Sequence, residues 1–254
     1  MPRITICHLY PEHLNLYGDR GNILALLRRA RWHGLEVRLI PIRPGYRFSL
    51  KQCDLLFMGG GQDAEQKMVC RDFQDRRLEL IDYIQQGMAI LAICGSFQLL
   101  GRYYTTAGGE QIPGLDLFDF YTEGGRKRMI GDIVTRCHCF SPPRTLVGFE
   151  NHGGRTFLGP GLRPLGTVLR GYGNNGSDRT EGMIYKNVIG TYLHGALLPK
   201  NPWLADHLLQ KALEYRGYNL RLKALDDTLE EEAHNFILQR CLSPLFRRRD
   251  SAMN

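Results

Sequence analysis

The chain has 254 residues, of which 43% are hydrophobic and 23% charged; this composition is globular and excludes wholesale disorder and a collagen-like structure. Its 33 basic and 26 acidic residues give a net charge of +7, which is too diffuse to indicate a nucleic-acid partner. Arg3 follows the N-terminus closely, and the longest strongly apolar run, residues 88–94, is far shorter than a membrane span. Seven scattered cysteines argue against a disulfide framework, so we expect a cytoplasmic protein.

The first part of the chain predicts alternating strands and helices. We expect strands at residues 4–7, 35–42, 54–58 and 88–93. A helix capped by Asp19 begins at residue 21 and ends near Gly34, and a second helix is expected over residues 71–86. The strand at residues 88–93 is apolar on both faces, as in a central parallel strand covered on two sides. This alternation predicts a doubly wound α/β sheet.

The second half predicts little helix between residues 116 and 192. Short strand-like runs are separated by Gly, Asn and Pro, with a hairpin turn at Lys186 and Asn187 and a mobile loop at residues 171–176. Helices are expected from Pro202 to about Arg216 and over residues 226–239. We therefore predict one domain over residues 1–216 and a helical C-terminal appendage of unknown role over residues 217–254. The strand-like runs are residues 131–135, 145–149, 182–184 and 188–192.

Cys94 is the strongest candidate for a nucleophile. It follows the apolar strand at residues 88–93 and precedes residues 95–101, which predict the start of a helix. A side chain at such a turn is held exposed above the sheet edge, and the helix N-terminus favours thiolate over thiol. The small neighbours Ala92, Gly95 and Ser96 allow a sharp turn. An inert buried cysteine is the alternative, and the local sequence favours the nucleophile.

A thiolate that attacks an acyl group needs an oxyanion hole and a base. Residues 59–61, all glycine, follow a neighbouring strand at the end where ligands bind in such sheets. Their backbone N–H groups can point into the cleft opposite the amide of Gly95, although a plain connecting loop is the alternative. Among the eight histidines, His194 is the best-placed base because it ends a predicted strand and precedes Gly195. His152 is its rival.

Several motifs together resemble those of class I glutamine amidotransferases. They are residues 93–101 (ICGSFQLLG), 58–63 (MGGGQD) and 190–195 (GTYLHG). Residues 15–22 (NLYGDRGN) and 148–156 (GFENHGGRT) resemble the GatD-type subunits of lipid II isoglutaminyl synthase, within the branch that also contains cobyric acid synthases. The resemblance covers about residues 4–216 and identifies them as a glutaminase domain. It implies a flavodoxin-like, mostly parallel sheet flanked by helices, with extra β-strands in the second half.

The resemblance implies a role for five residues. Cys94 carries the γ-glutamyl thioester, His194 moves protons, and the backbone amides of Gly60 and Gly95 form the oxyanion hole. Arg128 matches the arginine that holds the glutamine carboxylate, which suits a guanidinium fork. Without the resemblance, a surface cation in a basic run is the better interpretation of Arg128. No metal or organic cofactor is implied in this subunit.

The sequence departs from the family pattern beside the histidine. The acidic residue that usually stands two positions later is replaced by Ala196, and a histidine without an orienting carboxylate is a weak base. The resemblance implies that an aspartate of a MurT-like Mur-ligase partner completes the triad in a heterodimer. ATP and magnesium are expected on that partner, which would also bring lipid II, because this chain has no P-loop pattern. We therefore predict that the chain without its partner hydrolyses glutamine feebly.

Other interpretations stay open at this point. The chain could be a glutaminase subunit that serves another synthase, such as a corrinoid one, or a stand-alone cysteine γ-glutamyl hydrolase. A non-catalytic interaction module is a third possibility, and the intact Cys94 and His194 argue against it. Cys137, His138 and Cys139 resemble metal ligands but have the wrong spacing for structural zinc and no second pair.

Overall fold

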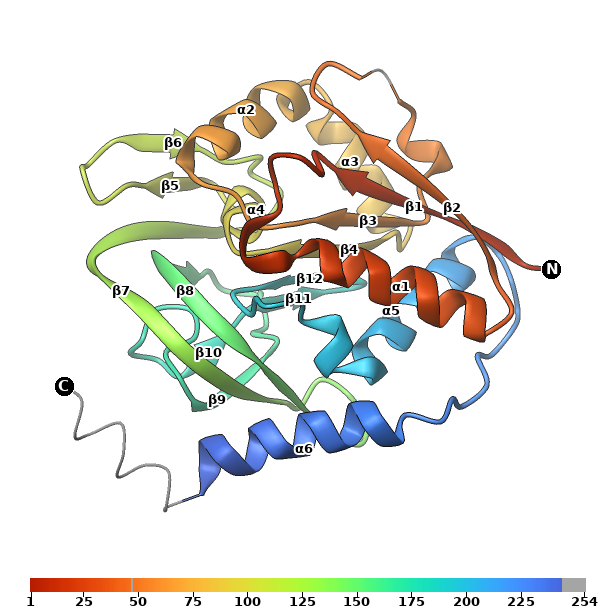
Figure 1. The fold of residues 1–254 in the computed structure, drawn as a ribbon. Helices are drawn as coiled ribbons and strands as arrows, with labels where there is room; N and C mark the ends of the chain where they lie inside the picture. The colour runs from red at the N-terminus through yellow and green to blue at the C-terminus, as the bar shows by residue number, and fades with distance from the viewer. Residues whose placement is uncertain (47, 244–254) are drawn as a thin grey trace.

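The α/β fold expected from the sequence is confirmed in a computed structural model, which describes residues 1–46 and 48–243 (Figure 1). Within these residues the first sheet has six strands, and every pair of neighbours is parallel except β11 with β12. The order from β2 to β12 is that of a flavodoxin-like doubly wound sheet. Across the sheet the strands are β11 (Met183–Tyr185), β12 (Val188–Thr191), β4 (Ala89–Ile93), β3 (Leu55–Met58), β1 (Arg3–Leu9) and β2 (Glu36–Ile42).

Helices cover both faces of the first sheet. Figure 1 shows α1 (Arg20–Trp32) and α5 (Pro202–Tyr215) on one side, and α2 (Asp63–Gln74) and α3 (Arg77–Gln85) on the other. Strand β4 is buried at every residue, as its two-sided apolar pattern predicts. Each large apolar side chain of such a strand contributes roughly 1.5–3 kcal/mol to stability when it is fully buried.

The single helix predicted over residues 71–86 is wrong, because the chain forms two helices there. Helix α2 already begins at Asp63, where Gln62 and Glu65 form a reciprocal capping box. The break between α2 and α3 lies at Arg76, which has φ −104° and ψ 5° and whose N–H donates to Phe73 O. This bond spans only three residues, so the regular helical ladder is interrupted. The apolar spacing on which the prediction depended is carried by two helices instead of one.

A second sheet forms in the β-rich half. It consists of β5 (Tyr103–Thr105), β6 (Gln111–Pro113), β7 (Phe120–Cys137), β8 (Arg144–Leu158), β9 (Gly166–Arg170) and β10 (Thr180–Glu181). Strands β7 and β8 form a long antiparallel hairpin whose register shifts between Gly124 and Met129. The runs predicted at residues 131–135 and 145–149 are therefore parts of much longer strands. Lys186, at φ 50°, lies in the predicted tight turn between β11 and β12.

The C-terminal region contains the expected helix, α6 (Thr228–Leu242), which runs along the second sheet (Figure 1). Ile237 and Cys241 pack with Val134 and Val147 in a small apolar cluster. The segment before α6 is anchored to α1 by a bond from Arg29 Nη1 to Asp227 Oδ1 (2.6 Å). The division at residue 216 stays a prediction. No helix in the described ranges is long and apolar enough to cross a membrane.

Candidate active site

Cys94 lies at the predicted strand-to-helix turn. It follows β4, precedes the short helix α4 (Gly95–Leu99) and has φ 50° and ψ −106°. A non-glycine residue in such a conformation costs about 1–3 kcal/mol, which the surrounding structure must supply. Two backbone bonds hold it: Cys94 N–H donates to Thr191 O (2.8 Å), and Gln98 N–H donates to Cys94 O (2.9 Å). Cys94 is only 7% exposed, so the prediction that this turn holds the thiol exposed above the sheet edge is wrong for this conformation.

The glycine loop at residues 59–61 fits between Cys94 and the base because it has no side chains. A Cβ atom on Gly60 would lie 2.7 Å from His194 Cε1, and one on Gly95 would lie 2.4 Å from Gly61 O. Both separations are too short for a real Cβ, so glycine is required at these two positions. Ser96 Oγ donates to Gly59 O (2.6 Å) and fixes the loop to α4. Gly60 therefore lies against the imidazole of His194, and Gly61 lies against Gly95.

His194 lies at the same sheet edge as Cys94. It follows β12, and β12 is the parallel neighbour of β4. Its backbone exchanges two hydrogen bonds with Phe149 of β8, His194 N–H to Phe149 O (2.7 Å) and Phe149 N–H to His194 O (3.3 Å). The side chain is completely buried and close enough to Cys94 for the ring and the thiol to interact. The rival candidate His152 has no such place beside the thiol.

The charges around His194 favour its protonated form. Burial would lower the pKa of His194, but the Cys94 thiolate and the Asp19 carboxylate outweigh it and raise the pKa to about 10. A thiolate–imidazolium pair is the state in which a cysteine is nucleophilic and a proton is ready for the leaving group. Within the described residues neither ring nitrogen of His194 makes an aligned hydrogen bond. Catalytic hydrogen bonds commonly tighten only when substrate binds.

Sequence reasoning missed the second role of Asp19. It places Asp19 correctly at the N-cap of α1, but the side chain makes no capping bond there. Instead Asp19 Oδ2 lies 3.3 Å from His194 Nδ1 and accepts a bond from Gly60 N–H (2.7 Å). The Gly60 N–H, predicted for the oxyanion hole, is therefore occupied in this conformation. Asp19 lies in the motif at residues 15–22, which was the available signal.

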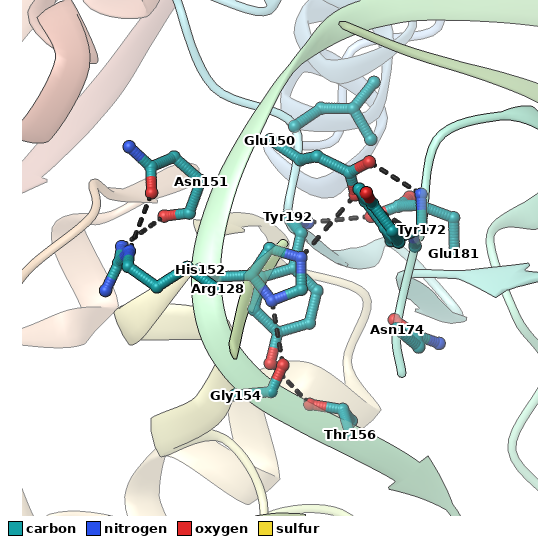
Figure 2. Close-up of polar contacts among 12 residues, drawn as sticks. Arg128, Glu150, Asn151, His152, Gly154, Thr156, Tyr172, Asn174, Glu181 and Tyr192 are labelled. Atoms are coloured by element: carbon teal, nitrogen blue, oxygen red, sulfur yellow. Dashed lines mark hydrogen bonds and ion pairs between the residues drawn. The ribbon is translucent and has the colours of Figure 1, made fainter. Parts of the chain in front are cut away.

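Arg128 lies where β7 changes register, between Gly124 and Met129. Its exposed side chain donates from Nε to Asn151 Oδ1 and from Nη2 to Asn151 O, both at 2.9 Å (Figure 2). The pKa of Tyr104 is raised to about 12, mainly by burial and then by the charges of Asp63 and Cys94. Arg128 acts in the opposite direction and lowers this pKa. Cys94 and Arg128 therefore both influence the charge state of the same tyrosine. A guanidinium there, held by an amide, suits a carboxylate ligand.

His152 belongs to a buried polar network between the two sheets. Figure 2 shows its ring beside that of Tyr192, and the two rings stack at 3.6 Å with an angle of 9°. His152 Nδ1 donates to Gly154 O (2.8 Å), while Nε2 lies 3.6 Å from Glu150 Oε2. Glu150 also accepts the backbone N–H groups of Tyr172 (2.6 Å) and Gly173 (3.0 Å). These bonds fix the loop at residues 171–176, which the sequence predicted to be mobile.

Residues that could hold a metal were sought across the described part of the chain. Within residues 1–46 and 48–243 no group of three or more His, Cys, Asp or Glu side chains is arranged to bind a metal ion. Burial raises the pKa of both the Cys137 and the Cys139 thiol, so each is disfavoured as a thiolate ligand.

Comparisons with known proteins agree with this geometry. Residues 5–202 match the CobB/CobQ-like glutamine amidotransferase domain. The chain is 42% identical over 240 residues to the GatD subunit of lipid II isoglutaminyl synthase (glutamine-hydrolyzing) from Staphylococcus aureus, which covers 94% of this chain and 97% of that protein. The GatD subunit from Streptococcus pneumoniae is 42% identical over 232 residues, 91% of this chain and 88% of that protein. Cobyric acid synthase from Pelotomaculum thermopropionicum is 32% identical over 160 residues, 58% of this chain and 29% of that protein.

Solved structures share the fold. A glutamine amidotransferase from Thermotoga maritima superposes with a TM-score of 0.53 at 15% identity, covering 94% of this chain and 98% of that chain. The glutaminase domain of Trypanosoma brucei CTPS, with bound acivicin, gives a TM-score of 0.54 at 10% identity, covering 87% and 96%. At these identities the likeness concerns the fold. The chain belongs to the CobB/CobQ-like glutamine amidotransferase family, and the GatD subunits match it along nearly their whole length.

Proposed function

We propose that this chain is the glutaminase subunit of a lipid II isoglutaminyl synthase. It hydrolyses L-glutamine through a thioester on Cys94 and supplies ammonia to an ATP-dependent, MurT-like partner, which amidates the D-glutamate of lipid II. The proposal depends on the juxtaposition of Cys94 and His194 at one edge of the first sheet. The identity of 42% to two GatD subunits, along nearly their whole length, supports the choice of partner and acceptor.

The first half-reaction uses the thiolate–imidazolium pair. The Cys94 thiolate attacks the side-chain amide carbon of glutamine, and the oxygen becomes an oxyanion that backbone N–H groups stabilise. We assign this role to Gly95 and Gly60, and Gly60 must first release its bond to Asp19. The imidazolium of His194 then gives its proton to the amide nitrogen, the C–N bond breaks, and ammonia leaves.

The second half-reaction needs His194 as a base. When the thioester forms, the thiolate charge is gone, and this charge is the largest of the influences that raise the pKa of His194. The pKa of the imidazole therefore falls, and the neutral ring accepts a proton from water. The hydroxide attacks the thioester carbonyl, the C–S bond breaks, and glutamate leaves. Cys94 is again a thiolate beside an imidazolium.

Substrate binding is assigned to Arg128. Its guanidinium is exposed and is oriented by Asn151 (Figure 2). A bidentate bond to the α-carboxylate of glutamine would fix the distance between that end of the substrate and Cys94. This role separates binding from chemistry, because Arg128 is not in contact with the reacting amide.

The partner completes the proposed enzyme. ATP and magnesium are expected to bind to the MurT-like chain, in a heterodimer in the cytoplasm, where lipid II is reached through the partner. The resemblance also assigns to the partner an aspartate that orients His194. In the present conformation Asp19 of this chain lies beside the same imidazole, with Oδ2 3.3 Å from Nδ1.

The test of the enzyme uses the glutamine analogue 6-diazo-5-oxo-L-norleucine. We expect it to label Cys94, as located by peptide mass spectrometry, and we expect no labelling of the Cys94→Ala variant. Labelling of a different residue, or none with the partner present, would contradict the glutaminase. Cys70→Ala serves as a control, because Cys70 is a buried cysteine on α2 that the mechanism does not use.

The test of the partner is affinity purification of the full chain followed by identification of the co-purifying protein. We expect a Mur-ligase-like chain, and we expect the pair to convert lipid II to its amidated form with L-glutamine, ATP and magnesium. Co-purification of a corrinoid synthase instead would leave the glutaminase in place and overturn the acceptor. Glutamate release should be much faster with the partner than without it, and equal rates would contradict a triad shared between the two chains.

A further inference from the structure

Helix α6 lies beyond residues 5–202, the part of the chain that matches the glutamine amidotransferase domain. Its side chain His234 is nevertheless buried beside η3 (Leu198–Lys200), a short 3₁₀ helix in the segment that follows His194. We propose that His234 is a positioning residue of His194, because it holds this segment in place from α6. This inference rests on the proposed function and gives the C-terminal helix a part in the glutaminase reaction.

The imidazole of His234 makes one hydrogen bond at each ring nitrogen. Nδ1 lies 2.9 Å from Lys200 O, and Nε2 lies 2.8 Å from Thr145 Oγ1. A carbonyl oxygen can only accept, so Nδ1 is the protonated nitrogen and donates to Lys200 O. In the neutral ring Nε2 then accepts the hydroxyl proton of Thr145. The bond to Thr145 fixes the orientation of the ring, and the bond to Lys200 fixes η3.

Both partners of His234 belong to segments that meet at His194. Lys200 ends the segment that begins just after His194, and Thr145 lies in β8, the strand that contains Phe149. Phe149 and His194 exchange two backbone hydrogen bonds, at 2.7 and 3.3 Å. The backbone of His194 is therefore joined to β8 directly and to η3 through the chain, and His234 contacts both.

The segment after His194 is held at two further points by buried asparagines. Asn22 Oδ1, on α1, accepts Leu198 N–H (2.8 Å). Asn201 exchanges two bonds with Val147 of β8, because Val147 N–H donates to Asn201 Oδ1 (3.0 Å) and Asn201 Nδ2 donates to Val147 O (2.8 Å). Neither asparagine has any exposed surface. Thus α1 and β8 each fix the segment by hydrogen bonds, and α6 fixes it through His234.

Lys200 also reaches back to the residue next to His194. A Cβ atom on Gly195 would lie 3.3 Å from Lys200 Nζ, so the side chain of the half-buried Lys200 lies against Gly195. Burial lowers the pKa of Lys200, Asp132 opposes this effect, and Arg240 of α6 adds to it. Arg240 forms an ion pair with Asp132, so α6 also sets the charges around Lys200. A displacement of Lys200 would therefore be felt at the residue beside the imidazole.

The way in which α6 is attached favours a directional role for His234. Within α6, all of which the structure describes, only His234 and Cys241 are buried, whereas Leu229 and Phe236 are 77% and 66% exposed. A polar side chain is costly to bury unless it is hydrogen-bonded, and an apolar residue would anchor a helix equally well. A bonded imidazole adds what apolar packing lacks, which is a fixed position for the carbonyl that it binds.

The test compares the wild-type complex of this chain and its partner with two variants of the same histidine. In His234→Asn the side-chain amide nitrogen takes the place of Nδ1 and can keep the bond to Lys200 O. In His234→Gln the longer side chain reaches the place of Nε2 and can keep only the bond to Thr145. For glutamine hydrolysis we expect kcat to fall at least about fivefold in His234→Gln and to stay within about twofold in His234→Asn, with KM changed less than about twofold in both.

Ile237→Val is the matched control. Ile237 lies on the same helix and packs in the apolar cluster with Val134 and Val147, but it makes neither of the two bonds of His234. The shorter side chain loosens the packing of α6, so the midpoint of denaturant unfolding should fall while kcat keeps the wild-type value. The unfolding midpoints of both histidine variants are measured beside it. A merely structural histidine would lower kcat in step with the midpoint in all three variants, whichever bond is kept.

A wild-type kcat in His234→Gln would overturn the inference, and so would equal losses of kcat in His234→Asn and His234→Gln. A rise in KM at constant kcat would also contradict it, because a positioned base acts on the transition state and not on the binding of glutamine. If the wild-type complex itself releases no glutamate, the proposed function fails and this inference fails with it. The wild-type rate therefore distinguishes the two failures.

Discussion

Two buried histidines differ in ways that separate a reactive site from a structural one. His194 and His152 each have a carboxylate oxygen within 4 Å of a ring nitrogen, at 3.3 and 3.6 Å. His152 lies within the regular strand β8, stacks on Tyr192 and donates to Gly154 O. His194 lies beside a thiol, and its ring nitrogens make no aligned bond within the described residues. A histidine–carboxylate pair is therefore not by itself a sign of catalysis.

Backbone strain shows the same contrast. Cys94, Tyr17 and Ala196 all have φ between 50° and 52°, and all three surround His194. A left-handed conformation is unfavourable for residues with a side chain, so it persists only where the surrounding structure enforces it. In the strand that carries His152, no residue between Arg144 and Leu158 has a positive φ, the glycines included. Strained backbone therefore lies next to His194, whereas none lies in the strand that carries His152.

The largest expected effect comes from the nucleophile. Cys94→Ala should lower glutamate release by about 10⁴-fold or more, because no thioester can form. The measurement is glutamate production by the purified complex. Cys70→Ala should stay within about twofold of wild type. Substantial glutamate release by Cys94→Ala would show that the nucleophile lies elsewhere. His194 could then no longer be contrasted with His152 as the histidine of the reactive site.

The two histidines can be compared directly by the same substitution. His194→Gln should lower kcat by about 10²–10⁴-fold, the range for loss of a general acid and base. His152→Gln should lower kcat less than about tenfold but reduce the free energy of unfolding by about 1–3 kcal/mol, because buried bonding partners are left unsatisfied. Steady-state kinetics and denaturant unfolding give both quantities. Equal losses of kcat would show that His152 takes part in the reaction.

Arg128 should affect binding more than turnover. Arg128→Gln removes a charge-assisted bond to the glutamine carboxylate, worth about 1.5–3 kcal/mol, so KM should rise about 10- to 100-fold with kcat nearly unchanged. Initial rates over a range of glutamine concentrations separate the two constants. Arg126→Gln, in the same exposed run, is the control. A fall in kcat at constant KM would exclude a pure binding role.

The smallest effect on activity is expected from Glu181, in the polar network. Burial raises its pKa to about 8, although Tyr192 N–H and Thr191 Oγ1 both donate to it. The folded protein therefore keeps a proton that the unfolded chain loses near pH 4.5, and this stabilisation disappears as the pH rises from 4.5 to 8. In wild type the free energy of unfolding should therefore fall by about 1–4 kcal/mol over this pH range. Glu181→Gln should reduce this fall and keep kcat within about twofold of the wild-type value.

Thermal unfolding between pH 5 and pH 8.5 measures this difference. The exposed Glu214→Gln should leave the wild-type pH dependence in place. An identical decline in wild type and Glu181→Gln would mean that Glu181 is ionised in the folded protein. The pH dependence of unfolding would then no longer distinguish the two regions, but the kcat values of the two histidine variants still would.

Local patterns predicted most of the fold, and long-range contacts account for what they missed. The apolar strand before Cys94 was identifiable because a short run that is apolar on both faces is typical of a buried parallel strand. The glycine loop at residues 59–61 was identifiable because it follows a strand at the end where ligands bind in such sheets. The direction of the Asp19 side chain could not be predicted from the sequence. An aspartate that caps its own helix has the same local sequence as one that accepts a bond from Gly60, 41 residues away.

The β-rich half was harder to predict for a related reason. The hairpin of β7 and β8 contains glycines and charged residues that obscure a period of two, and its pairing becomes evident only in three dimensions. The loop at residues 171–176 has the composition of a mobile segment, yet Asn174 has no exposed surface and its amide donates to Gly182 O (3.0 Å). The loop is held in place by hydrogen bonds to backbone groups outside it, which its composition does not reveal.

The paired backbone bonds between Phe149 and His194 have a mechanical consequence. Phe149 belongs to the long β7–β8 hairpin, whereas His194 follows a strand of the other sheet, so this bridge joins the two sheets at the imidazole. The position of the reacting imidazole is thus tied by backbone bonds to the same hairpin that carries Arg128.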